Sequence, residues 1–186
     1  MKTLLRRFVA CTLMGLAGCT TTDGFNTATD SLSIAELDLA TKTFQEVCIG
    51  TLPDFSGVAT FAQTQGFERM NLPGQSEFGA KTYRTNRKSV LAVTARFDED
   101  TPICGVVFLG PKDRKPVQDA FLETTTRSLG GNPRVKMPAP NNDVAYHLRN
   151  KSALIFESRT KFDSSSHYVY LTPPMSLAQA EAIVLK

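Results

Sequence analysis

The sequence of 186 residues lacks the motifs that identify common catalytic and metal sites. It contains no Cys-x-x-Cys or His-x-His pair, so the ligand spacing typical of a zinc site is absent. No Gly-x-Ser-x-Gly segment supports a hydrolase nucleophile, and no glycine-rich loop opens a helix to hold a phosphate. Its aromatic residues do not alternate with basic ones, as in proteins that bind single-stranded nucleic acid. We therefore predict no metal, no cofactor and no nucleic-acid partner.

The composition is that of a folded protein. Hydrophobic residues make up 41% of the chain and charged residues 21%, which excludes a disordered polymer. The length suits one domain or two small ones.

The first residues have the pattern of an export signal. Lys2, Arg6 and Arg7 form a basic start with no acidic residue, and the uncharged run Phe8–Leu16 follows. A short basic segment before an apolar run of this size is typical of a secretory signal. The run has nine residues, whereas a helix needs about 20 to cross a bilayer.

The apolar run ends in Leu16-Ala17-Gly18-Cys19. This segment resembles the lipobox of bacterial lipoproteins, in which a leucine and two small residues precede a cysteine. The resemblance implies that residues 1–18 are a signal peptide, removed after a diacylglyceryl group is attached to the Cys19 thiol, and that the new amine is acylated. Two or more acyl chains hold a protein stably on a membrane. The alternative is an ordinary signal peptide in which this cysteine has no role.

The residue after the anchor indicates which membrane holds it. Such lipoproteins commonly carry Asp after the cysteine when they stay in the inner membrane, and here Thr20 is present. The resemblance thus favours the periplasmic side of the outer membrane. Residues 19–32 are rich in Thr, Asp, Gly, Asn and Ser and predict a flexible tether with a reach of about 20 Å. Residues 33–186 then form one periplasmic domain.

Cleavage leaves two cysteines available for pairing. Cys11 departs with the signal and Cys19 is blocked by lipid, so Cys48 and Cys104 remain in an oxidising compartment. We predict a disulfide between them, which would contribute about 4 kcal/mol in the chain-entropy model. The alternative is two buried free thiols.

Charge is divided along the mature chain. The full chain has a net charge of +3, and the three basic residues of the signal account for all of it. Cys19–Glu68 carries a balance of −6 and Arg69–Lys186 a balance of +6. One interpretation is that the acidic segment packs across the basic one, fixed by the disulfide. The other is that the acidic segment is a removable cover or faces a basic partner.

Apolar periodicity predicts an α+β domain. A capping box at Ser33–Glu36 opens a helix that ends at Gly50, and a second helix runs from Pro53 to Gly66. Asn132–Asn142 contains three prolines and is interpreted as a loop. Six strands and two further helices are predicted at 77–84, 89–97, 103–109, 113–129 (helix), 143–148, 153–159, 167–171 and 176–185 (helix).

An internal repeat accompanies this order. A shift of 63 positions gives eight identities within 29 residues, among them Leu91 with Leu154 and Val106 with Val169. We therefore predict a duplicated βββα unit, about 77–129 and 143–185, that forms one antiparallel sheet after two N-terminal helices packed on it.

The repeat also aligns two basic turns between strands. Arg84, Arg87 and Lys88 lie in the first, and Arg149 and Lys151 in the second. These residues are a candidate contact for an anionic group, such as a lipid phosphate or an acidic protein patch. The alternative is that they are solvated turns, in which lysine also protects the strand edges.

Other polar residues give weaker signals. His167 follows three serines and could act as a base, but a polar turn explains the serines as well. Asp98, Glu99 and Asp100 could hold Ca²⁺ weakly, but they lack the spacing of a dedicated calcium loop.

The domain also resembles small exported proteobacterial proteins with no assigned activity, which carry a helix cysteine, then Pro-Asp-Phe, then a partner cysteine. Those residues are Cys48, Pro53-Asp54-Phe55 and Cys104 here. We expect a non-enzymatic module that binds a membrane lipid through acylated Cys19 and an envelope protein through its domain. The alternatives are an inhibitor or immunity lipoprotein against a toxin or cell-wall hydrolase, and a hydrolase.

Overall fold

A computed structural model describes residues 37–71, 79–85, 89–96, 101–139, 144–161 and 164–185. The predicted signal peptide (1–18), the predicted tether (19–32) with Cys19 and the predicted capping box at Ser33–Glu36 lie outside these residues. Within the described ranges, no helix is both long and apolar enough to span a bilayer.

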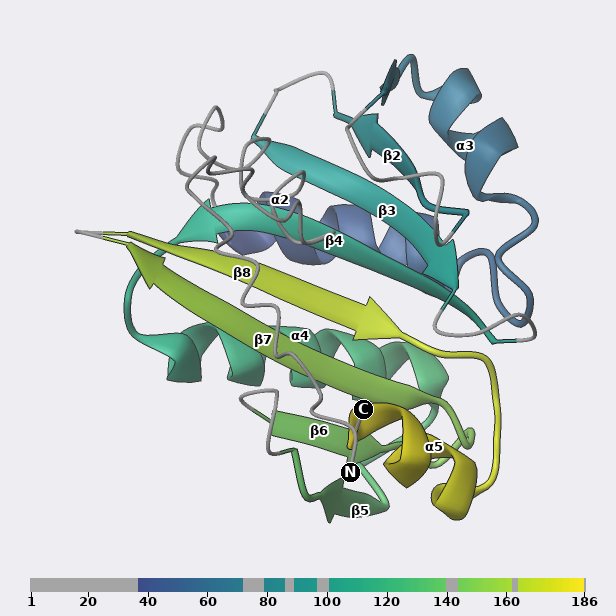
Figure 1. Ribbon diagram of the computed structural model, residues 1–186, viewed down its shortest axis with the longest axis vertical. Helices are drawn as coiled ribbons and strands as arrows, with labels where there is room; N and C mark the ends of the chain where they lie inside the picture. The colour runs from purple at the N-terminus through teal and green to yellow at the C-terminus, as the bar shows by residue number, and fades with distance from the viewer. Residues whose placement is uncertain are drawn as a thin grey trace, which may run out of the picture.

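Eight strands form one antiparallel sheet in the order β1-β2-β3-β4-β8-β7-β6-β5 (Figure 1). Each half of the sheet consists of four strands that follow one another along the chain, and the halves meet where β4 pairs with β8. The α+β class and the antiparallel sheet are thus confirmed. The strands are β1 (Glu68–Met70), β2 (Lys81–Arg84), β3 (Val90–Arg96), β4 (Pro102–Gly110), β5 (Val135–Met137), β6 (Val144–His147), β7 (Ala153–Lys161) and β8 (Ser164–Leu171).

Six of these strands correspond to the predicted ones, while the two outermost strands were not predicted. β1 and β5 have three residues each, too few to show an alternating pattern. β5 lies inside Asn132–Asn142, so the interpretation of that whole segment as a loop was wrong. The prolines at positions 133 and 138 flank β5 rather than interrupt it.

The N-terminal part of the described chain is helical. α2 (Leu37–Phe44) continues into a π-helical turn, η1 (Gln45–Ile49), and lies against β3 and β4. α3 (Val58–Thr64) follows. The second helix thus begins at Val58 and not at Pro53, because Phe55 has a φ of 58° and a left-handed residue interrupts a right-handed helix.

The two later helices begin and end as their sequences predict. α4 (Arg114–Leu129) follows Asp113, whose carboxylate accepts a hydrogen bond from the Lys115 amide at 3.0 Å. It ends at Gly130, where the φ of 91° is readily adopted by glycine. α5 (Leu177–Val184) begins with a capping box formed by Ser176 and Gln179.

α4 and α5 cover opposite faces of the sheet. Leu154 and Phe156 of β7 belong to the main core, which also contains the α4 residue Phe121. Ala153 and Ile155 of the same strand pack instead with residues of α5. Alternate residues of a strand point to opposite faces, so the helices lie on different sides, as Figure 1 also shows.

The predicted repeat agrees with the structure in β4 and β8 but not in β3 and β7. Val106 of β4 and Val169 of β8 pair directly and share the main core, as equivalent residues of two related strands would. Leu91 and Leu154, however, lie on opposite faces, because Leu91 packs with Val93 and Val107 away from the main core. The ungapped shift of 63 therefore does not hold through β3 and β7, and the duplication stays a prediction.

Candidate functional site

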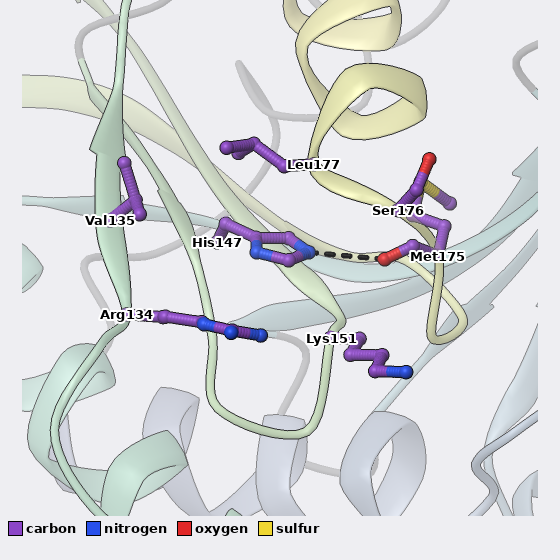
Figure 2. A pocket seen from close by; sticks show the side chains of 7 residues that line it. All are labelled: Arg134, Val135, His147, Lys151, Met175, Ser176 and Leu177. Atoms are coloured by element: carbon purple, nitrogen blue, oxygen red, sulfur yellow. Dashed lines mark hydrogen bonds between the residues drawn. The ribbon is translucent and has the colours of Figure 1, made fainter.

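An open pocket of about 450 Å³ lies beside β5, the turn between β6 and β7, and the start of α5 (Figure 2). Its size falls within the usual range for small-molecule sites. It is lined by Arg134, Val135, His147, Lys151, Met175, Ser176 and Leu177.

Backbone hydrogen bonds bring these three elements together. On one side, the amide of Arg134 donates to the carbonyl of His147 at 2.8 Å, next to the β5–β6 pair. On the other side, the amide of Met175 donates to the carbonyl of Lys151 at 2.9 Å. The second bond holds the segment that leads into α5 against the turn, so the helix begins at the mouth of the pocket.

His147 has one satisfied ring nitrogen and one unsatisfied. Its Nε2 lies 3.1 Å from the carbonyl oxygen of Met175, and because a carbonyl only accepts, Nε2 carries the hydrogen. Its Nδ1 is buried and has no hydrogen-bond partner. The side chain as a whole is 3% exposed. A buried polar atom without a partner costs free energy, which a ligand that bonds to it would recover.

The charge around the pocket has one sign. Arg134 and Lys151 are exposed, and among the residues that the structure describes neither an aspartate nor a glutamate belongs to the lining. The first turn of α5 adds the positive end of a helix dipole. Val135, Met175 and Leu177 contribute apolar surface beside these polar groups.

Comparisons with protein-family models, with curated proteins and with solved structures find no match for this chain. What the pocket binds is therefore inferred from the chemistry of its lining. That chemistry suits a small anion with an apolar part.

The structure separates the two basic turns. The β2–β3 turn follows Arg84 and leads to Val90, which pairs with Phe108 near the end of β4. The β6–β7 turn lies at the opposite end of the sheet, where Leu171 pairs with Cys104 near the start of β4. Five strand spacings also separate β2 from β6, about 24 Å at about 4.8 Å each. Arg84 and the β6–β7 turn are thus too far apart to contact the same small anion.

The individual residues of these turns differ in their surroundings. Lys151 lines the pocket, whereas Arg149 is exposed and does not belong to its lining. Arg84 is half-buried, and Arg87 and Lys88 lie outside the described residues. Sequence reasoning named Lys151 but missed Arg134 and His147 as its neighbours, since the sequence does not show that β5 pairs with β6.

The predicted disulfide is present. Cys48 of η1 and Cys104 of β4 are joined, with Cα atoms 5.4 Å apart, and both are fully buried. The bond connects the N-terminal helical segment to a central strand.

The described part of the acidic segment meets the sheet mainly through apolar side chains. The residues that α2 buries are Ala40, Thr43 and Phe44. Asp38 and Glu46 are exposed, and Glu46 lies 3.9 Å from Lys42 of the same segment. Hydrophobic packing and the disulfide therefore hold the described part of this segment in place, while Asp38 and Glu46 lie at the surface.

His167 does pair with a serine, but inside the core. Its Nδ1 lies 2.9 Å from the Ser158 hydroxyl and its Nε2 2.9 Å from the Pro111 carbonyl. The carbonyl fixes the hydrogen on Nε2, so Ser158 donates to Nδ1. The ring is 1% exposed, and a Cβ at Gly110 would come within 2.8 Å of it. Such close packing is typical of a structural hydrogen bond and leaves no room for a substrate at the ring.

Acidic and thiol groups give no metal site in the described part of the chain. No three residues among its histidines, cysteines, aspartates and glutamates lie close enough together to hold an ion. Asp98, Glu99 and Asp100 lie outside that part.

Proposed function

We propose that this chain is a lipoprotein anchored to the periplasmic side of the outer membrane, with a folded domain that binds another envelope component without catalysis. The anchor is acylated Cys19 in the segment Leu16-Ala17-Gly18-Cys19. The observation that carries the proposal is the buried disulfide between Cys48 and Cys104.

The disulfide supports an exported protein because of the compartment it needs. Structural disulfides form and persist in oxidising compartments such as the periplasm and are rare in the cytosol. Cys48 and Cys104 are the two cysteines that export and lipidation would leave unmodified. Their pairing in the core thus agrees with the export signal, although the two observations come from separate parts of the chain.

Membrane fractionation of cells that produce the full chain tests the anchor. Replacing Cys19 by Ala removes the acceptor thiol, so we expect Cys19→Ala to leave the membrane fraction. Cys11→Ala changes the other cysteine of the N-terminal segment and should leave the protein on the membrane. Retention of the Cys19→Ala protein, or equal release of both variants, would contradict the anchor.

Crosslinking in intact envelopes followed by pull-down tests the binding role. We expect the wild-type chain to capture a resident envelope-assembly protein, and Cys19→Ala, once released, to capture less of it. A secreted toxin or cell-wall hydrolase in its place would favour the inhibitor or immunity alternative and contradict the assembly role.

We also propose that β2–β4 and β6–β8 derive from the predicted duplication. The symmetric strand order and the direct pairing of Val106 with Val169 support it. The opposite faces of Leu91 and Leu154 require a one-residue shift between β3 and β7, and α4 and α5 cover different faces. The duplicated part is therefore the strands. In sequences of relatives, the two strand sets should resemble each other more when this shift is allowed, and an equal or poorer match would contradict the proposal.

A further inference from the structure

We propose that the pocket beside β5 and the start of α5 binds a phosphate monoester group, held by Arg134, Lys151 and the Nδ1 of His147. This deepens the proposed function, on which it rests, by giving the binding module a ligand of defined chemistry. The carrying observation is the juxtaposition of two exposed cationic side chains with a buried, unpartnered imidazole nitrogen in one pocket.

The two cations come from different elements and both line the open pocket. Arg134 immediately precedes β5, and in Figure 2 its side chain extends below His147 toward the turn that carries Lys151. Guanidinium groups bind phosphate oxygens through two parallel hydrogen bonds, and ammonium groups bind them as point charges. The described part of the lining contains no carboxylate, so none of its side chains competes with the ligand for these cations.

His147 supplies the third donor. Its Nε2 is already engaged by the carbonyl of Met175, so only Nδ1 can meet a ligand, and in Figure 2 Nδ1 lies on the side of the ring that faces Arg134. In the imidazolium form Nδ1 carries a hydrogen and donates to an anionic oxygen. A phosphate monoester, with up to two negative charges and three terminal oxygens, has an acceptor for each of the three donors.

The other groups that line the pocket indicate the chemistry of the rest of the ligand. The first turn of α5 begins at the pocket, and amide groups at a helix start favour a negative charge. Val135, Met175 and Leu177 provide apolar surface, and about 450 Å³ exceeds the space that a phosphate group alone needs. The ligand therefore carries a short organic arm, as glycerol phosphate or the headgroup of phosphatidic acid does.

The chain has two histidines, which makes nitrogen NMR of the full-length protein a direct test. With labelled histidine, His147 and His167 give separate imidazole signals, and His167 is an internal control because both of its nitrogens are bonded within the core. On titration with inorganic phosphate and then glycerol phosphate, we expect the Nδ1 signal of His147 to move toward that of a protonated nitrogen. The signals of His167 should stay in place.

Variants show whether the contact is specific. Arg134→Gln and Lys151→Asn should each raise the midpoint of the titration about tenfold, since each removes one cationic contact to the ligand. Asparagine is chosen because Lys151 has a φ of 72°, which asparagine tolerates. Arg149→Gln removes an equal charge from the same turn outside the pocket and should change the midpoint less than about twofold.

The outcomes distinguish a soluble ligand from a lipid headgroup. They also distinguish failure of the pocket proposal from failure of the anchor proposal. A shift with glycerol phosphate supports a soluble ligand, and one with vesicles that contain phosphatidic acid supports a lipid headgroup. No shift of His147 with any probe would overturn the site, as would an equal loss in Arg149→Gln and Lys151→Asn. Fractionation of Cys19→Ala depends on none of these residues, so the anchor and the pocket fail independently.

Discussion

The two halves of the sheet are covered and fixed in different ways. The half formed by β1–β4 is fixed to the N-terminal helical segment by a buried disulfide and by α2 on one face. In the half formed by β5–β8, α4 and α5 cover the two faces, and a pocket stays open beside α5. The disulfide and the open pocket thus lie in different halves of the sheet. A ligand that binds in the half formed by β5–β8 therefore need not disturb the half formed by β1–β4.

The halves share one aromatic cluster. Phe121 of α4 lies 5.3 Å from Phe44 of α2, 5.7 Å from Phe108 of β4 and 6.5 Å from Phe156 of β7, measured between ring centroids. One side chain thus contacts both halves and the helices on their common face.

Removal of this shared ring should have the largest effect on stability. We expect Phe121→Ala to lower the free energy of unfolding by about 3–5 kcal/mol, because it leaves a cavity at the junction of the halves. Urea denaturation measures the loss. Phe61→Ala is the matched control, since that ring is half-buried and its aromatic neighbour is Phe67 rather than Phe121. An equal loss in both variants would mean that the cluster does not join the halves.

Removal of the disulfide should affect the halves unequally. The double replacement C48A/C104A should cost about 2–4 kcal/mol, a little less than the loss of Phe121, because the unfolded chain regains freedom. Hydrogen exchange should show faster opening of α2, β3 and β4 than of β6 and β7. Reduction of the unaltered protein is the control and should give the same pattern. Uniform loss of protection in both halves would show that the disulfide stabilises the whole domain and not one half.

The sequence was sufficient for features that depend on local pattern. The central strands alternate or are apolar throughout, α5 has its capping box, and exclusion of two cysteines left one pair to form the disulfide. It was insufficient where distant segments create the structure. β1 and β5 are strands because a neighbour supplies their hydrogen bonds.

The candidate site was only partly predictable for the same reason. Lys151 was identified from its turn, and the strand that contains His147 was predicted. Their common pocket depends on the bond from Met175 to Lys151, which joins residues 24 positions apart in the chain. No local pattern predicts that α5 returns to this edge of the sheet, or that Arg134 precedes a strand paired with β6.

The smallest expected effect on the free energy of unfolding concerns the two buried histidines. His167 is satisfied at both nitrogens by Ser158 and Pro111, whereas His147 has a partner at Nε2 alone. Ser158→Ala would remove the hydroxyl that donates to the Nδ1 of His167. Since no ligand can reach that nitrogen to replace the donor, we expect a loss of about 1–2 kcal/mol in the free energy of unfolding, measured in urea.

A matched variant distinguishes the hydrogen bond from packing. Ser158→Thr keeps the hydroxyl and suits a strand, so it should retain most of the lost stability. Phosphate that stabilises the Ser158→Ala protein as much as the unaltered one would show that binding acts through His147 and not His167. If Ser158→Ala cost nothing, water would be able to reach His167. The core would then not be closed around its ring, and the contrast between His167, bonded at both nitrogens, and His147, bonded at one, would be wrong.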